Sequence, residues 1–177
     1  FVGGGDHNVY ALDASNGHIL WSVPTGGEVN SSPAVYRGVV YVGSYDHQIY
    51  ALDASTGNVI WTASTGDYVY SSPTIANGRV YVGSHDNYVY AFDAVTGALD
   101  WKVLTGGDYG VWSSPSVAYG RVYVGATIPD SSLYALDAKT GRTLWKFTTG
   151  STVFGSPAIA NGIVFIGSVD SNIYALD

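Results

Sequence analysis

Short apolar stretches separated by polar turns run along the whole chain. Between residues 69 and 106, four runs of apolar or alternating residues are separated by clusters rich in Asn, Asp, Thr and Gly. Runs of about five residues with this alternation are typical of β-strands, and no window shows the 3.6-residue period of a capped helix. The pattern predicts an all-β fold with four short strands in every unit of about 40 residues.

One phrase recurs along the chain and gives the length of that unit. It reads Ala-x-Asp-x-x-(Thr/Asn)-Gly-x-x-x-Trp, and its tryptophans stand at steps of 40, 40 and 44 residues. Complete copies occupy residues 11–21, 51–61, 91–101 and 135–145, and a shortened copy occupies residues 175–177. Four antiparallel strands at this period predict a β-propeller in which each repeat is one blade. We expect residues 1–177 to be a single propeller segment of about four to five blades.

Each copy of the phrase places an aspartate at the start of a turn. A side chain at this place accepts hydrogen bonds from backbone N–H groups two or three residues further on. A residue that recurs in every blade cannot build one unique catalytic or metal site, so we interpret these aspartates as structural. The same reasoning applies to the repeated tryptophans, whose large aromatic area suits the contact between blades. The structural set is Asp13, Asp53, Asp93, Asp137, Trp21, Trp61, Trp101 and Trp145.

The repeated phrase resembles the tryptophan-docking motif of pyrroloquinoline-quinone-type (PQQ-like) β-propeller repeats, and all four complete copies fit it. The resemblance implies that each tryptophan is buried between blades, over the alanine of its own motif and the backbone of the next. It also implies a first blade without its inner strand, three whole blades and a last blade without its outer strand. Rings of this family usually close at seven or eight blades, so the chain corresponds to about half a ring. We therefore expect it to associate with the remainder of such a ring or with a second copy.

Charge and composition narrow the function classes. The net charge is −7 and the seven Lys and Arg residues are scattered, which argues against a nucleic-acid-binding surface. The chain has no cysteine, so disulfides, thiolate catalysis and Cys-based zinc sites are excluded. The histidines lie singly on separate loops and predict no metal site. The longest apolar runs have the length of strands, and we expect no transmembrane helix.

Three functions are compatible with such a propeller. Similarity to the outer-membrane β-barrel assembly lipoprotein favours a non-catalytic scaffold that binds a protein, peptide or cell-surface ligand and needs no cofactor. Similarity to quinoprotein dehydrogenases implies instead a fragment of an enzyme that uses PQQ and Ca²⁺, although the chain has neither adjacent cysteines nor long inter-blade insertions. A surface-layer or carbohydrate-binding module is the third alternative. The family resemblance favours a periplasmic, cell-surface or secreted location.

Function is expected where the repeats differ from one another. The loop before each Ser-Pro segment varies most, and it is predicted to lie at the mouth of the propeller channel. Three of the four residues at one position of this loop are aromatic, which suits a binding surface. The alternative is that these aromatics fill the channel as part of the core. The candidate ligand-binding residues are Asn30, Tyr70, Asp108, Tyr109, Trp112 and Phe154.

A second variable set consists of the hairpins at residues 6–8, 46–48, 85–87, 128–130 and 170–172. We expect these hairpins to lie on the same face as the first set. The irregular 44-residue step places two-residue insertions in both sets, near Asp108 and near Pro129. That sector is predicted to be the most individual part of the face.

Overall fold

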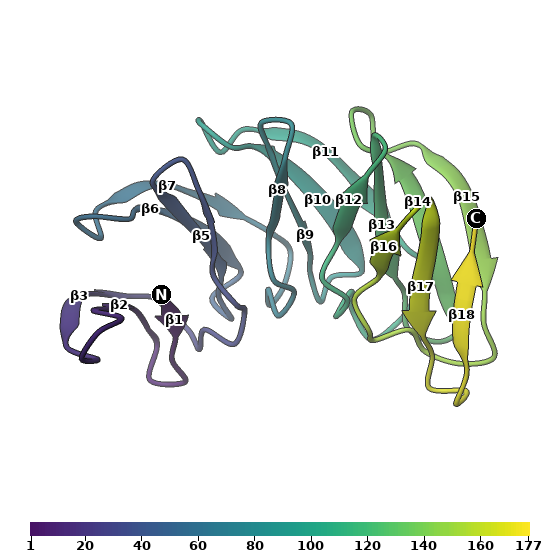
Figure 1. Cartoon of the computed structure of the whole chain (residues 1–177), viewed down its shortest axis with the longest axis horizontal. Coiled ribbons are helices and arrows are strands. Elements are labelled where there is room, and N and C mark those ends of the chain that lie inside the picture. The colour runs from purple at the N-terminus through teal and green to yellow at the C-terminus, as the bar shows by residue number, and fades with distance from the viewer.

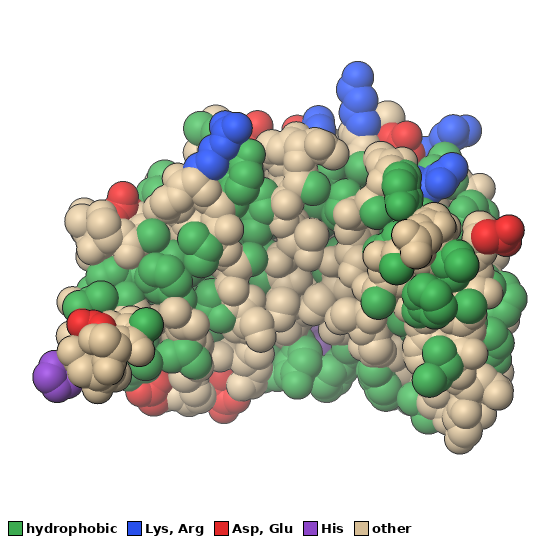
Figure 2. All heavy atoms as spheres, in the orientation of Figure 1, with side chains coloured by type: hydrophobic (Ala, Val, Ile, Leu, Met, Phe, Trp, Pro, Cys, Tyr) green, Lys and Arg blue, Asp and Glu red, His purple; other side chains and the backbone are tan.

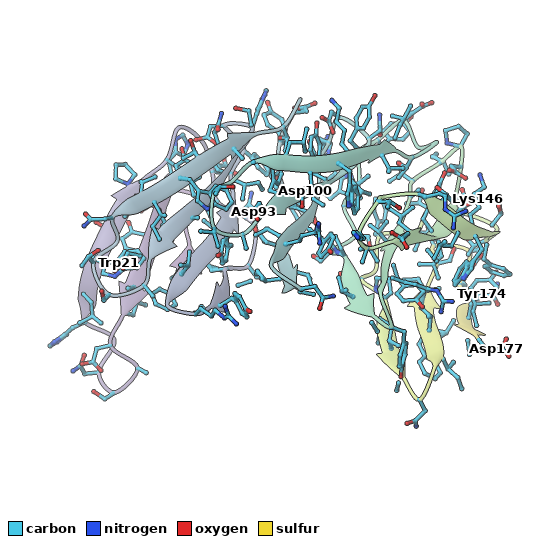
Figure 3. All side chains as sticks on the ribbon, turned by 90° about the horizontal axis from the view of Figure 1, so that it is seen from above. Trp21, Asp93, Asp100, Lys146, Tyr174 and Asp177 are labelled. Carbon is cyan, nitrogen blue, oxygen red and sulfur yellow. The ribbon has the colours of Figure 1, made fainter.

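The computed structural model describes residues 1–177 as five antiparallel β-sheets that stand side by side along an arc (Figures 1 and 3). Within each sheet, every strand pairs with its neighbour in the chain. The structure contains no helix with the length and apolar character needed to cross a membrane.

The first and last sheets have three strands each. The first consists of β1 (Val2–Gly3), β2 (Asn8–Leu12) and β3 (Ile19–Pro24). The last consists of β16 (Ala158–Ala160), β17 (Ile163–Gly167) and β18 (Ile173–Leu176).

The three central sheets have four strands each. The second sheet contains β4 (Ala34–Tyr36), β5 (Val39–Gly43), β6 (Gln48–Asp53) and β7 (Val59–Ser64). The third contains β8 (Thr74–Ala76), β9 (Arg79–Gly83), β10 (Tyr88–Asp93) and β11 (Leu99–Leu104). The fourth contains β12 (Ser116–Ala118), β13 (Arg121–Gly125), β14 (Ser132–Asp137) and β15 (Thr143–Thr148).

This arrangement confirms the predicted all-β propeller, here as a partial ring. The short strands β4, β8, β12 and β16 contact one another in order, so they are the inner strands at the concave side of the arc. The first sheet has no counterpart of these inner strands, and the last sheet has no counterpart of β15. This distribution of strands is the one that the resemblance to PQQ-like repeats implied.

The hairpins between the inner strand and the second strand owe their form to turn chemistry. In the β8–β9 hairpin, Asn77 and Gly78 have φ values of 52° and 76°, as a two-residue turn of the primed type requires. The corresponding turns place Arg37 and Tyr119 at φ values of 51° and 52°. These non-glycine residues accept the left-handed conformation because the flanking strands determine the turn.

The hydrophobic core lies between neighbouring sheets rather than inside one of them. One cluster joins Tyr41 and Ile49 of the second sheet to Val80 and Phe92 of the third. The next cluster joins Tyr81 and other residues of the third sheet to the fourth. Each blade is therefore stabilised mainly by apolar area that it shares with its neighbours.

The repeated tryptophans lie in these inter-blade contacts. Trp101 pairs in register with Ala91 of its own blade and donates from Nε1 to the carbonyl oxygen of Ala138 in the next blade, at 3.2 Å. Gly141 of the next blade lies against the indole, because a Cβ there would come within 2.7 Å of its ring. Trp21 and Trp61 make the same bond to Ala54 and Ala94, at 3.1 and 3.2 Å.

The repeated aspartates close the turns between the third and the outer strands. Asp53 accepts from the backbone N–H groups of Ser55 and Thr56, at 3.0 and 2.8 Å. Hydrogen bonds from these two residues, that of the Ser55 hydroxyl above all, lower the pKa of Asp53. The carboxylate of Asp53 therefore stabilises the turn in which it lies.

Serines of the repeated Ser-Ser and Gly-Ser segments join the inner strands. The Ser32 amide donates to the hydroxyl of Ser72 at 2.9 Å, and the Ser72 amide donates to that of Ser114 at 3.0 Å. The Ser114 amide continues the row to Ser156 at 3.1 Å. These bonds satisfy backbone N–H groups at the place where the blades converge. The inner strands are too short to satisfy these groups by pairing with other strands.

Candidate functional site: an aromatic rim on the loop face

Two sets of loops meet at one rim of the arc. The loop before each inner strand accepts a hydrogen bond from the hairpin between the second and third strands of the same blade. Examples are His85 N to Tyr68 O at 2.9 Å and Val169 N to Thr152 O at 3.0 Å. The prediction that the two variable sets share a face is therefore confirmed.

The sequence-based alignment of the hairpins with one another contains two errors. It starts the third hairpin one residue too early and the fourth hairpin two residues too early. In every copy an aspartate accepts a hydrogen bond from the tyrosine hydroxyl four residues later. Four of these aspartates also accept from a glycine amide of the preceding blade. The repeated spacing Asp-x-x-x-Tyr was the missed signal. The pairs are Asp6–Tyr10, Asp46–Tyr50, Asp86–Tyr90, Asp130–Tyr134 and Asp170–Tyr174.

These Asp–Tyr pairs make the stability of the fold sensitive to alkaline pH. Burial, together with the hydrogen bond donated to Asp46, raises the pKa of Tyr50 to about 12. Because the pKa is raised in the folded state, the stabilisation is complete below about pH 10 and is lost as pH rises through the folded value. We expect urea midpoints to fall over this range, and to fall less in Tyr50→Phe. An equal fall in the variant and the native chain would contradict the role assigned to Tyr50.

The aromatic rim is a connected group of rings from four neighbouring blades. Tyr45 stacks on Tyr68 at a centroid distance of 4.9 Å, and it lies 6.4 Å from Tyr70. Trp112 lies 4.7 Å from Tyr70 and meets Phe154 edge-on at 5.7 Å. Two histidines complete the group, which consists of Tyr45, His47, Tyr68, Tyr70, His85, Trp112 and Phe154.

The rings of this group are accessible to a partner. Tyr70 is 38% exposed and Phe154 49%, and Trp112 is half-buried between them. A space-filling view of the concave side shows hydrophobic side chains gathered at the lower edge, near the middle of the arc (Figure 2).

The loop of residues 107–111 holds Trp112 in place. The indole Nε1 donates to the carbonyl oxygen of Tyr109 at 2.5 Å. The Gly110 amide donates to Oδ1 of Asn87 at 2.7 Å. Gly110 has a φ of 81°, and a Cβ at this position would clash with His85. Because these bonds fix the loop before any partner arrives, the rim is pre-organised.

The other candidate residues occupy different surroundings. Tyr109 and Asp108 are exposed beside Trp112, and the Asp108 amide donates to Ile128 O at 2.9 Å. The two insertions of the 44-residue step are thus in direct contact. Asn30 lies apart, in a pocket of about 350 Å³ next to β1, where its amide group donates to Glu28 at 3.2 Å. The ligand-binding role of all six candidates stays a prediction.

Sequence reasoning did not place Tyr45 or His85 among the candidate ligand-binding residues: Tyr45 lies one residue before the hairpin set, and His85 was assigned only to that set. Both stand directly before the hairpin aspartate, where the other copies have glycine, proline or valine. An alignment on the repeated Asp-x-x-x-Tyr spacing would have identified this position as variable.

The structure offers two further observations about ligands. Nowhere in residues 1–177 do three or more His, Asp or Glu side chains gather as a metal site. At the opposite rim, a pocket of about 260 Å³ is lined by Tyr36, Tyr41, Ile60 and Val95 among others.

A family model decides the classification. The model that describes the β-propeller of the beta-alanine-activating enzyme matches residues 1–177. This chain belongs to that propeller family. A comparison of this chain with curated protein sequences found no match.

Solved structures show the same PQQ-like propeller fold. BamB from Moraxella catarrhalis superposes with a TM-score of 0.87 at 18% identity, covering 98% of this chain and 56% of BamB. The computationally designed Ika8 protein gives 0.85 at 20% identity, with 98% and 54% covered. Quinohemoprotein alcohol dehydrogenase from Comamonas testosteroni gives 0.82 at 20% identity, with 96% and 38% covered. The chain spans about half the length of the first two, and these likenesses show the fold alone.

Proposed function

We propose that this propeller segment is a non-catalytic binding module whose aromatic rim takes a protein or peptide partner. The observation that carries the proposal is the connected, partly exposed set of rings contributed by four blades. Aromatic side chains supply large contact area at little entropic cost, and they dominate the energy of many interfaces. The repeated residues are occupied in holding the blades together, whereas the rim residues differ from blade to blade.

The proposal is tested by selecting binders from a displayed random peptide library. Selection uses the native chain, and affinities of the enriched peptides are then measured by calorimetry on native and variant chains. We expect the double variant Tyr70→Ala, Trp112→Ala to weaken binding by about 30-fold or more, because two central aromatic contacts are removed.

Tyr119→Asn is the matched control for this experiment. Tyr119 is an exposed aromatic at the opposite rim, and asparagine tolerates its positive φ. Binding by this variant is expected to match that of the native chain. Peptides that bind the Tyr70, Trp112 double variant as tightly as the native chain would contradict the proposed function.

We also propose that the face of the last sheet is covered by a further blade of the same repeat. Ile173 is 83% exposed there, whereas the equivalent residues Ile49, Val89 and Leu133 are fully buried against the next sheet. Phe165 is also exposed, although its equivalents Tyr41, Tyr81 and Tyr123 are buried. Apolar positions that are covered in every interior blade support a partner built in the same way.

A further inference from the structure

The loops of the aromatic rim carry acidic residues and no lysine or arginine. All seven Lys and Arg residues lie at or next to the turns of the opposite rim or on outer strands: Arg37, Arg79, Lys102, Arg121, Lys139, Arg142 and Lys146. Figure 2 shows the blue side chains of the visible face gathered along the upper edge. Lys146 reaches a hairpin of the lower rim from β15, and its charge is paired there with Asp130, Nζ to Oδ1 at 2.8 Å.

Three rim carboxylates remain accessible for a partner. Asp108 is exposed and makes no side-chain hydrogen bond, and Glu28 is exposed with one bond to Asn30. Asp67 accepts from the Tyr68 amide at 2.7 Å, and its Oδ1 lies 3.7 Å from Nε2 of His47. The hairpin aspartates differ, because their oxygens are already bonded to tyrosine hydroxyls and glycine amides.

The accessible acids and the rings occur together in the chain. Asp67 directly precedes Tyr68, and Asp108 directly precedes Tyr109, at the same loop of consecutive blades. A guanidinium or ammonium group over an aromatic face gains cation–π attraction, and a nearby carboxylate adds a charge-assisted hydrogen bond. Neither the aromatic rings nor the carboxylates alone select a cation, but the two kinds of group lie at the same loops of the rim.

We infer that the partner segment of the aromatic rim is cationic. It is an extended peptide that places arginine or lysine side chains over the rings around Tyr70 and Trp112, with their charges toward Asp67 and Asp108. Because the rings come from four blades and form a row, several side chains of one peptide can make contact at once. This inference rests on the proposed function and names the chemistry of its partner.

Synthetic peptides test the inference directly. Four capped peptides share one Gly-Ser background and carry at alternate positions arginine, lysine, glutamine or glutamate, and a soluble oligosaccharide is the fifth probe. We expect the arginine peptide to bind most tightly, because its planar group both stacks and forms bidentate bonds, followed by the lysine peptide. Raising the salt from about 50 mM to about 300 mM is expected to weaken binding about tenfold.

Two sets of variants separate the contributions of charge and aromatic area. Asp67→Asn with Asp108→Asn is expected to weaken binding of the arginine peptide about tenfold and to abolish most of its salt dependence. Asp13→Asn with Asp137→Asn, at the opposite rim, is the charge-matched control and is expected to bind as the native chain does. Circular dichroism of each variant confirms that the fold is retained.

The outcomes distinguish this inference from the proposed function. A glutamine peptide that binds as tightly as the arginine peptide, or binding of the oligosaccharide alone, overturns the cationic partner while leaving the rim as a binding surface. Failure of both the arginine and the lysine peptide also overturns it. The proposed function itself falls only if the library selection yields no peptide that depends on Tyr70 and Trp112.

Discussion

Replacing Trp101 by alanine is expected to lower the free energy of unfolding by about 3–5 kcal/mol, the range for truncating a large buried aromatic side chain. Only 9% of Trp101 is exposed. Its ring lies between Ala91 of its own blade and Gly141 of the next blade. The variant also leaves the Ala138 carbonyl without one of its two donors, the other being the hydroxyl of Tyr81 at 2.9 Å. Urea unfolding followed by circular dichroism measures the change.

Two further variants locate the source of this loss. Trp101→Phe keeps most of the apolar area and removes the indole N–H, so we expect a smaller loss of about 1–2 kcal/mol. Trp112→Ala removes a half-buried tryptophan of the aromatic rim and is expected to cost less than Trp101→Ala, since less of its area is buried. If Trp112→Ala proved as destabilising as Trp101→Ala, the division between scaffold and binding tryptophans would be wrong.

Self-association through the end face is the second large effect that we expect. In an isolated preparation, the only source of another blade is a second copy of the chain, so the sedimentation coefficient is expected to rise with protein concentration. Ile173→Asp places a charge on the exposed apolar face and is expected to weaken this association about tenfold or more, because burying an unpaired charge is costly.

The control for the end face is Val95→Asp. Val95 is nearly as exposed as Ile173, at 78% against 83%, but it lies in a turn of the third sheet. Its replacement is expected to leave association unchanged. A native chain that stays monomeric over the full concentration range would contradict the proposal that a further blade covers this face.

The repeat made much of the architecture predictable. The phrase that ends at Trp21, Trp61, Trp101 and Trp145 predicted the period, the four strands per blade and the incomplete first and last sheets. Asn77 and Gly78 likewise predicted their turn, since the left-handed conformation of both is a local property. Such features depend on residues close together in the chain, and each additional copy of the repeat strengthens the inference.

The candidate site was predictable only in part. Tyr70, Trp112 and Phe154 were found because they vary at one position of the repeat, and the structure brings their rings together. Tyr45 was missed because it lies one residue before the hairpin set, and His85 was placed in that set without being singled out as a ligand-binding candidate. The hairpin aspartates were assigned to a variable set, although Asp46 and Asp86 bind tyrosines and join blades.

The sequence alone determined that the chain is a row of four-stranded blades held together by recurrent tryptophans, because those features repeat within each copy. Only the tertiary structure decided which loop residues of different blades meet. The packing angle between sheets brings Tyr70 and Trp112, from adjacent blades, to a ring distance of 4.7 Å. That angle depends on the whole inter-blade core, and no local pattern encodes it. The same geometry brings Lys146 of β15 to the rim aspartate Asp130, although the rim loops themselves contain no lysine or arginine.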